Sequence, residues 1–403
     1  MRRFGSILFA AGAFAGVLWS SEARADIMDP ALNRLVLVDA NNPDCRARGP
    51  GGLTYYNPLS GFRRCTPDNV PWANLVAQYG AALAPNGMHA ARTTGYGGFE
   101  LSLEANFTNI DNKANYWIQG TEGPRDPSTG NFSSLGDPDG VLQVYDLKIA
   151  KGLPFGFELI GTVGYAARTS IVTGGADVRW SLFEGFRTGI PAIFPELTVG
   201  GSVRTMTGSQ QMQLTIAGAD ATLSKPFAVG GSVLFTPYIG YQYLRIFGDS
   251  GLIDLTPNTD ALAYCNSRGQ NTPATPDPNK RYDDGGFYHD GQPVCGGAPA
   301  NSADFNNNVV FTAVRLNRHR LGGGFNLRFQ MVQLGMHFIS DVVDVKDANK
   351  DQLCTQPDCS GSSEPQWGRN WLEHAQRTGK TQVEAFPDVG RQWTFSVSLG
   401  AVL

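Results

Sequence analysis

The chain has 403 residues, a formal charge of −4 and a mean hydropathy of −0.21, values that are ordinarily found in water-soluble proteins. Its mildly acidic balance argues against a nucleic-acid partner. Glycine and proline are abundant, at 49 and 24 residues, while aromatic residues still make up 11% of the chain. This composition suits strands joined by turns and irregular loops, and it leaves little room for long helices.

The first residues have the three parts of a secretory signal in the correct order. Two arginines follow Met1, then an apolar run extends from Phe4 to Trp19, and the small-residue site Ala23–Ala25 comes next. We expect residues 1–25 to be a signal peptide that is cleaved before Asp26. An uncleaved membrane anchor is the alternative, for which the apolar run is short. Beyond it, no run reaches the ~20 apolar residues that a membrane-spanning helix needs.

Residues 26–94 come next and contain one predicted helix. Asp68 can cap its N-terminus, and Pro71 is tolerated in the first turn. An apolar stripe at helical spacing then consists of Trp72, Leu75, Val76, Tyr79 and Leu83. The opposite face also has no charge, which is unusual for a helix exposed to water; its members are Asn74, Ala77, Gln78 and Ala81. Pro85-Asn86-Gly87 ends the helix.

From Gly98 onward, apolar and polar residues alternate at every second position, which is the period of a β-strand. The first such segment is Gly98–Thr108, and the pattern recurs at 145–149, 155–168, 172–182, 196–205, 211–223, 232–247, 308–329, 331–343 and 391–403. We therefore predict about ten strands, or twelve if a further strand lies in one of the loops.

The last segment, Arg391–Leu403, ends the sequence with an apolar face that no helix follows to cover. The interior of a bilayer would accept such a face. Here the chain resembles the outer-membrane β-barrel proteins of Gram-negative bacteria, whose closing strand ends in an alternating segment. Those proteins usually have an aromatic residue at the last position, where this chain has Leu403. The resemblance implies an all-β fold, a membrane-spanning antiparallel up-and-down barrel at residues 95–403, located in the bacterial outer membrane.

The connections between the predicted strands support this topology. The long ones, near 110–140, 248–307 and 346–390, all fall on one side, which would be the outer side of the membrane. A soluble β-sandwich is the alternative, but it gives no reason for aromatic residues near strand ends. The candidates for aromatic girdles are Tyr145, Phe157, Tyr165, Trp180, Tyr241, Phe329 and Trp393.

The polar face of the strands carries charges of both signs, which we expect to line the lumen. These residues are Glu100, Glu104, Asp146, Lys148, Glu158, Arg168, Asp177, Arg179 and Arg204, together with His337. They would pair with one another in a narrow lumen, or else form the selectivity lining of a channel. Many other inward positions are small, and a barrel of eleven strands holds a central helix. We therefore predict that segment 26–94 enters or caps the lumen from the periplasmic side, with a rim helix or a spacer as the alternatives.

The six cysteines form three pairs that are close in sequence, in stretches predicted to be non-strand. An exported chain reaches an oxidising compartment, so we expect local disulfides, with a metal site as the rival interpretation. The pairs are Cys45 with Cys65, Cys265 with Cys295, and Cys354 with Cys359.

One short stretch has the spacing of a calcium loop, with Asp347, Asn349 and Asp351 as candidate ligands. Gln352 stands where such a loop needs glycine, and Asp358 stands where glutamate is usual. Calcium is therefore the one cofactor considered, and no other cofactor is expected.

A run of cationic residues follows the second long loop: Arg315, Arg318, His319 and Arg320. It could bind lipopolysaccharide phosphates, since arginine matches phosphate oxygens, or it could be a solvated rim. For catalysis, only His337 of the five histidines lies on a predicted inward face, and no nucleophile is paired with it by sequence. We expect no enzyme.

The function predicted from these patterns is a narrow or plugged channel for passive transport of small molecules. The first alternative is a non-conducting barrel that binds partners or has a structural role through its outer loops, and the second is an outer-membrane hydrolase. We expect a monomer in contact with outer-membrane lipid and lipopolysaccharide, and the sequence leaves any protein or small-molecule partner open.

Overall fold

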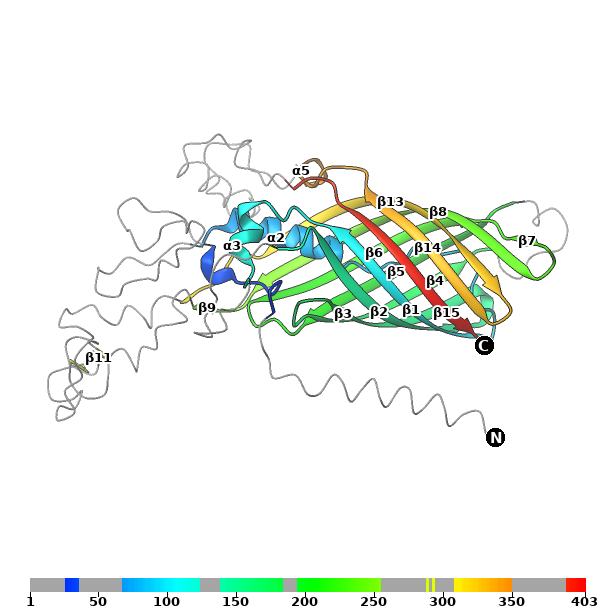
Figure 1. Ribbon diagram of the computed structural model, residues 1–403, viewed down its shortest axis with the longest axis horizontal. Helices are drawn as coiled ribbons and strands as arrows, with labels where there is room; N and C mark the ends of the chain where they lie inside the picture. The colour runs from blue at the N-terminus through cyan, green and yellow to red at the C-terminus, as the bar shows by residue number, and fades with distance from the viewer. Residues whose placement is uncertain are drawn as a thin grey trace.

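The computed structural model describes residues 26–35, 67–123, 138–183, 194–254, 288–289, 292–293, 308–349 and 389–403. They form a closed antiparallel barrel of 10 strands, which confirms the predicted fold class (Figure 1). The barrel strands are β1 (Phe99–Asn109), β2 (Val141–Gly152), β3 (Phe157–Ala166), β4 (Val172–Ser181), β5 (Glu196–Thr207), β6 (Met212–Ser224), β8 (Val233–Ser250), β13 (Val314–Phe329), β14 (Val332–Asp341) and β15 (Trp393–Val402).

Each barrel strand pairs with its neighbour in sequence, and the barrel closes between the first and last strands. The closing register of β1 with β15 runs from Glu100 opposite Val402 to Thr108 opposite Thr394. A closed ladder satisfies every strand's hydrogen bonds and leaves no open edge. Shorter pairings join β7 (Phe227–Val229) to β8, β9 (Ile253–Asp254) to β12 (Asn308–Val309), and β10 (Tyr288–His289) to β11 (Gln292–Pro293). The segment predicted as one strand from 308 to 329 is thus divided into β12 and β13.

The two ends of the barrel differ. The three long connections, from β1 to β2, β8 to β13 and β14 to β15, all leave the same end, which we call the loop end (Figure 1). The opposite end, which we call the turn end, holds Leu403 and the β7–β8 hairpin. The sequence predicted this arrangement, with all three long connections on one side of the barrel.

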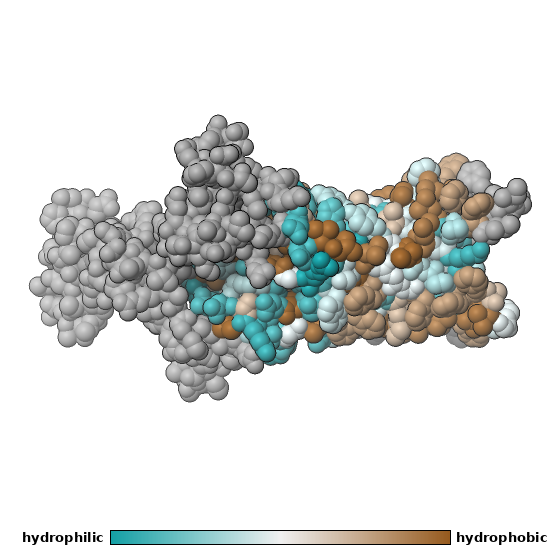
Figure 2. All heavy atoms as spheres, turned by 90° about the horizontal axis from the view of Figure 1, so that it is seen from above, coloured by the Kyte–Doolittle hydropathy of each residue, from teal (hydrophilic) through white to brown (hydrophobic). Residues whose placement is uncertain are grey.

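The outer face of the wall is apolar. Leu103, Val163, Ile239 and Leu399 are between 53% and 57% exposed, and the seven aromatic residues predicted for the girdles have exposed side chains as well. Figure 2 shows apolar residues gathered on the wall nearer the turn end and polar residues nearer the loop end. Large apolar surfaces of this kind on a folded protein mark contact with lipid or another protein.

Helices are few and short among the described residues: η1 (Leu32–Arg34), α2 (Asn69–Ala82), α3 (Asn115–Gly120), η3 (Pro154–Gly156) and α5 (Val345–Ala348). The predicted helix is α2, and the carboxylate of Asp68 caps it by accepting the N–H of Val70 at 3.2 Å. In the part of the chain that the structure covers, no helix is both long enough and apolar enough to cross a membrane.

Segment 26–94 was predicted to enter or cap the lumen from the end opposite the long connections, and the structure places its helix α2 at the end where those connections leave. The helix lies inside the barrel at the loop end, and only the residues after Leu83 continue to the turn end (Figure 1). The apolar lining explains this location, because the inward residues at the loop end of β5, β6 and β8 are apolar. The inward residues of β13 and β14 at that end include charged ones, Arg318, Arg320 and Asp341, which pair with one another.

Candidate functional site

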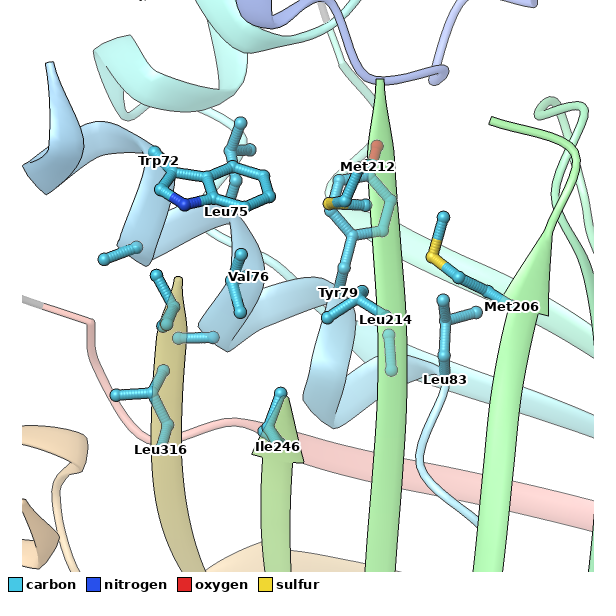
Figure 3. Packing of buried hydrophobic residues seen from close by; sticks show 14 of the residues in the cluster. Trp72, Leu75, Val76, Tyr79, Leu83, Met206, Met212, Leu214, Ile246 and Leu316 are labelled. Carbon is cyan, nitrogen blue, oxygen red and sulfur yellow. The ribbon is translucent and has the colours of Figure 1, made fainter. Parts of the chain in front are cut away.

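The loop-end half of the lumen is filled by α2. Trp72, Leu75, Val76 and Tyr79 are completely buried, and they pack with inward side chains of the wall (Figure 3). Those wall residues come from neighbouring strands and include Met206 of β5, Met212 and Leu214 of β6, Ile246 of β8 and Leu316 of β13. The uncharged back face of the helix is buried too, with Gln78 at 1% exposure. Burial on every side therefore explains why α2 has no charged residue on any face.

Two glycines let the helix approach the wall closely. A Cβ atom added to Gly80 of α2 would lie 2.7 Å from two carbons of the Ile246 side chain. A Cβ atom added to Gly248 of β8 would lie 2.5 Å from Cγ1 of Val76. Side-chain and backbone surfaces thus interlock at distances that leave no passage between helix and this part of the wall.

On the side that faces the loop end, α2 is covered by α3 and by the residues around η1. Gln78 organises this cover, because its Oε1 accepts the indole N–H of Trp117 at 2.5 Å and its Nε2 donates to the hydroxyl of Tyr116 at 2.5 Å. Tyr79 donates its hydroxyl to the carbonyl of Met28 at 2.5 Å. Nearby, burial raises the pKa of Asp29 above its usual range, even though its carboxylate accepts backbone N–H groups.

Below α2 the chain becomes extended, and wall side chains bind its backbone. Gln242 donates to the carbonyl of Pro85 at 2.8 Å, and Thr198 donates to the carbonyl of Ala91 at 2.5 Å. The N–H of Ala91 donates to Ser224 at 2.9 Å. These contacts satisfy backbone groups that an extended segment cannot pair internally.

Asn86 is the central side chain of this polar half. Its amide nitrogen donates to Glu104 at 2.8 Å and to Ser396 at 3.0 Å, and it also donates to Asn106. Its backbone carbonyl accepts from Lys148 at 3.3 Å. The sequence indicated Asn86 only as a helix terminator, and its place after a proline gave no sign of this role.

The charged residues around this segment form ion pairs across the interior of the barrel, and some of them join strands that are not neighbours. Lys148 lies 2.8 Å from Glu104, and Arg204 lies 3.0 Å from Asp146. Arg179 lies 3.5 Å from Asp220, a buried carboxylate of β6 that the prediction omitted. Asp177 is buried in the same region. Buried pairs such as these stabilise poorly in themselves, but breaking one leaves an uncompensated charge.

A polar cavity of about 90 Å³ remains at the turn end of the lumen. Glu100, Glu158, His89 and His337 are among its lining residues. Glu158 accepts the N–H of Thr94 at 2.9 Å and lies 3.9 Å from the Nε2 atom of His89. The cavity has room for water molecules and polar partners to hold them.

His337 faces Ser396 across the β14–β15 pairing. The hydroxyl of Ser396 donates to Asn106 at 2.6 Å, so its hydrogen bond belongs to the network around the lumen segment. The arrangement holds a chain segment in place, and its described hydrogen bonds do not join a serine to a base.

Several predicted site residues lie elsewhere. Arg168 was expected in the lumen, but it lies in the turn between β3 and β4 with a φ of 61° and pairs with Asp139 at 2.6 Å, where its side chain is 50% exposed. The strand ends at Ala166, and the turn that follows breaks the alternation that would have placed residue 168 inside. Arg168 therefore faces the loop end and not the interior.

The cationic run on β13 divides between the two faces of the wall. Arg318 and Arg320 are 1% exposed and lie inside, where Arg318 donates to Asp341 at 2.6 Å. His319 lies outside and contacts Tyr241 at 2.5 Å between Nδ1 and the hydroxyl oxygen. The four residues do not form one phosphate-binding rim, because alternate residues of a strand point to opposite faces.

Of the three candidate calcium ligands, the structure describes Asp347 and Asn349, and their side chains have different surroundings. Asp347 is exposed on α5, whereas Asn349 is buried and its side chain binds the backbone of Asn317, accepting at 2.7 Å and donating at 3.0 Å. Asp351 lies outside the described residues, as do all six cysteines. Within the described ranges, no group of three or more His, Cys, Asp or Glu side chains could hold a metal ion.

No family model matches this chain, and no curated protein matches it. Among solved structures, it is similar to Ail, the attachment invasion locus protein of Yersinia pestis, at 8% identity over 76% of this chain and 99% of that one, with a TM-score of 0.23. The outer membrane protein OpdK from Pseudomonas aeruginosa gives 10% identity over 76% and 99%, with a TM-score of 0.13. The ferric citrate transporter FecA gives 9% over 62% and 39%, with a TM-score of 0.17.

Proposed function

We propose that the protein is an integral barrel of the bacterial outer membrane that stays closed to solutes and serves as a rigid scaffold for binding at its loop end. The apolar outer wall supports the membrane location, since water would not accommodate it. The long connections at one end and Leu403 at the other support an orientation with the loop end outside. We further propose that the barrel acts as a monomer and that its interior performs no enzymatic reaction.

The observation that carries the closed state is the packing of α2 in the loop-end half. Its apolar stripe and its uncharged back face are both buried, and Gly80 lets the helix lie against Ile246 without a gap. A passage for solutes through that half would require the helix to leave. Expelling such a helix would expose several completely buried side chains, at roughly 1.5–3 kcal/mol for each large apolar one.

A passive channel is the second candidate, and the polar cavity at the turn end favours it. In that case the cavity would be a vestibule and α2 a gate that opens in the membrane. The two candidates differ in one property, because a scaffold is silent under voltage and a gated channel opens.

Conductance of the refolded full-length protein in planar bilayers tests the proposal. We expect no openings from the wild type. A Gly80→Leu variant should conduct, since a side chain at that position collides with Ile246 and displaces the helix, and it shows that the assay detects an open lumen. Gly174→Leu is the matched control, because a Cβ atom added there meets nothing within 4 Å. Frequent openings of the wild type would favour the channel instead.

We also propose that outer-membrane lipid, lipopolysaccharide included, contacts the wall near the loop end of β8 and β13. Arg245 and Arg315 both lie next to the Phe247 ring, with guanidinium carbons 6.0 and 5.5 Å from its centroid. Arginine in such a position can bind phosphate oxygens at the membrane surface. If so, an Arg245→Gln, Arg315→Gln variant should retain less lipopolysaccharide after purification than the wild type, and equal retention would refute the assignment.

A further inference from the structure

The residues that precede α2 are fixed at the loop end of the barrel. The N–H of Met28 donates to the carbonyl of Arg168 at 3.0 Å, in the turn between β3 and β4. The N–H of Leu32 donates to Gln211 at 2.6 Å, next to the start of β6. The N–H of Ala31 donates to the carbonyl of Gly120, the last residue of α3, at 2.8 Å. All three partners belong to the loop end.

Burial shows that this placement is part of the folded core. Met28 and Leu32 are completely buried, and Leu35 is 1% exposed. They belong to the same apolar cluster as α2, and Tyr79 of that helix donates to the carbonyl of Met28. Moving these residues away from the loop end would therefore disrupt the same apolar cluster that holds α2 in the lumen.

The chain leaves the described residues after Leu35 and returns at Pro67, and both points lie together. The N–H of Asp68 donates to the carbonyl of Leu35 at 2.9 Å. From there α2 descends into the lumen, and the extended segment reaches the turn end, where Gly97 donates to the carbonyl of Gly152 at 3.3 Å. The first barrel strand begins at Phe99 on that same end (Figure 1).

The chain therefore crosses the length of the barrel once, inside the lumen, before the first strand begins. We propose that the protein displays its own N-terminal segment on the cell surface by holding this crossing inside the barrel. Asp26, which is exposed, then lies on the outer side of the barrel next to the long connections, while the residues after it anchor the segment in the core. The proposal rests on the proposed function, because it requires the loop end to face the outside.

The physical reason is the lack of another route. A segment placed across the bilayer outside the barrel would leave unpaired backbone groups in hydrocarbon, and each such group costs several kcal/mol there. Inside the lumen, wall side chains bind the backbone of the extended part, as Thr198 and Ser224 do for Ala91. The lumen thus acts as a passage for one segment of polypeptide.

Accessibility of an epitope on intact cells tests the proposal. The full-length protein carries one short epitope directly before Asp26, and two controls carry the same epitope elsewhere. One control has it after Gly361, in the connection from β14 to β15 at the loop end, and the other has it between Gly230 and Gly231 at the turn end. A Cβ atom added to Gly230 or to Gly231 meets nothing within 4 Å, so an insertion between them is tolerated sterically. Folding of each variant is checked by its mobility on unheated gels.

We expect antibody to bind intact cells with the epitope before Asp26 as well as with that after Gly361, and external protease to remove both. The epitope between Gly230 and Gly231 should be reached only after lysis. If only the Gly361 epitope is reached on intact cells, the display proposal is wrong while the proposed orientation stands. If only the Gly230 epitope is reached, or none is, the orientation or location fails and both proposals fall with it.

Discussion

Gly80 lies where α2 touches the barrel wall, and a single added methyl group tests that contact. In an isolated helix, Gly80→Ala should stabilise by ~1 kcal/mol through helix propensity. In this barrel the new Cβ would lie 2.7 Å from two carbons of Ile246, which is completely buried. Overpacking of this kind costs about 1–3 kcal/mol. The two effects together predict a net loss of about 1 kcal/mol.

A double-mutant cycle separates the collision from other effects. Ile246→Ala alone should cost about 2–5 kcal/mol by creating a cavity. Combined with Gly80→Ala, the loss should be smaller than the sum by about 2 kcal/mol, because the new methyl group occupies space that Ile246 vacates. The free energy of unfolding is measured by urea titration in lipid vesicles with tryptophan fluorescence, and Gly174→Ala serves as control. A stabilising Gly80→Ala, or additive effects, would refute the packing described for α2.

The remaining predictions concern the polar half, the loop end and the cysteines. Asn86→Leu should lower the free energy of unfolding by about 1–3 kcal/mol in the same titration, since it removes hydrogen bonds to three buried acceptors; an unchanged midpoint would contradict this. Asp341→Ala should cost more, about 3–5 kcal/mol, because it leaves two buried arginines, Arg318 and Arg320, without their carboxylate. Burial raises the pKa of Asp29 above 3.8, so the folded chain holds that proton more tightly and stability falls as pH rises through the interval above 3.8. Asp29→Asn should reduce that fall, and an identical pH profile would count against it. Peptide mapping without reductant should return Cys265 linked to Cys295, and a link from Cys265 to another loop would contradict local pairing.

The sequence predicted the strands and the helix because each is specified by a local period. Alternation from Gly98 onward located every barrel strand, and the stripe beginning at Trp72 located α2. The uncharged back face of α2 also indicated burial. A local period does not predict at which end of the barrel the helix lies. That location depends on which inward residues of different strands lie at the same level along the barrel axis, and this level is set by the strand register.

Residues at strand boundaries were the least predictable part of the candidate site. Arg315 and Arg320 are close in sequence, and treating them as one rim did not apply the strand alternation to them, although both lie in the segment predicted as a strand and found in β13. Once the strand is known, the pairing of Arg320 with Asp341 across β13 and β14 places the arginine inside. The relevant signal was the carboxylate on the next strand, and its register becomes known only when the turn between the strands is known.

The two halves of the lumen match the two conformations of the segment that fills it. A helix pairs its own backbone groups, so α2 can lie among apolar side chains without cost to hydrogen bonding. An extended segment cannot, and from Pro85 to Thr94 its N–H and C=O groups meet wall side chains such as Gln242 and Glu158. Sliding the segment along the barrel would bring apolar side chains against charges and unpaired backbone against aliphatic walls, both of which are unfavourable. The segment inside the lumen can therefore leave the barrel by unfolding, but no position shifted along the barrel axis is stable for it.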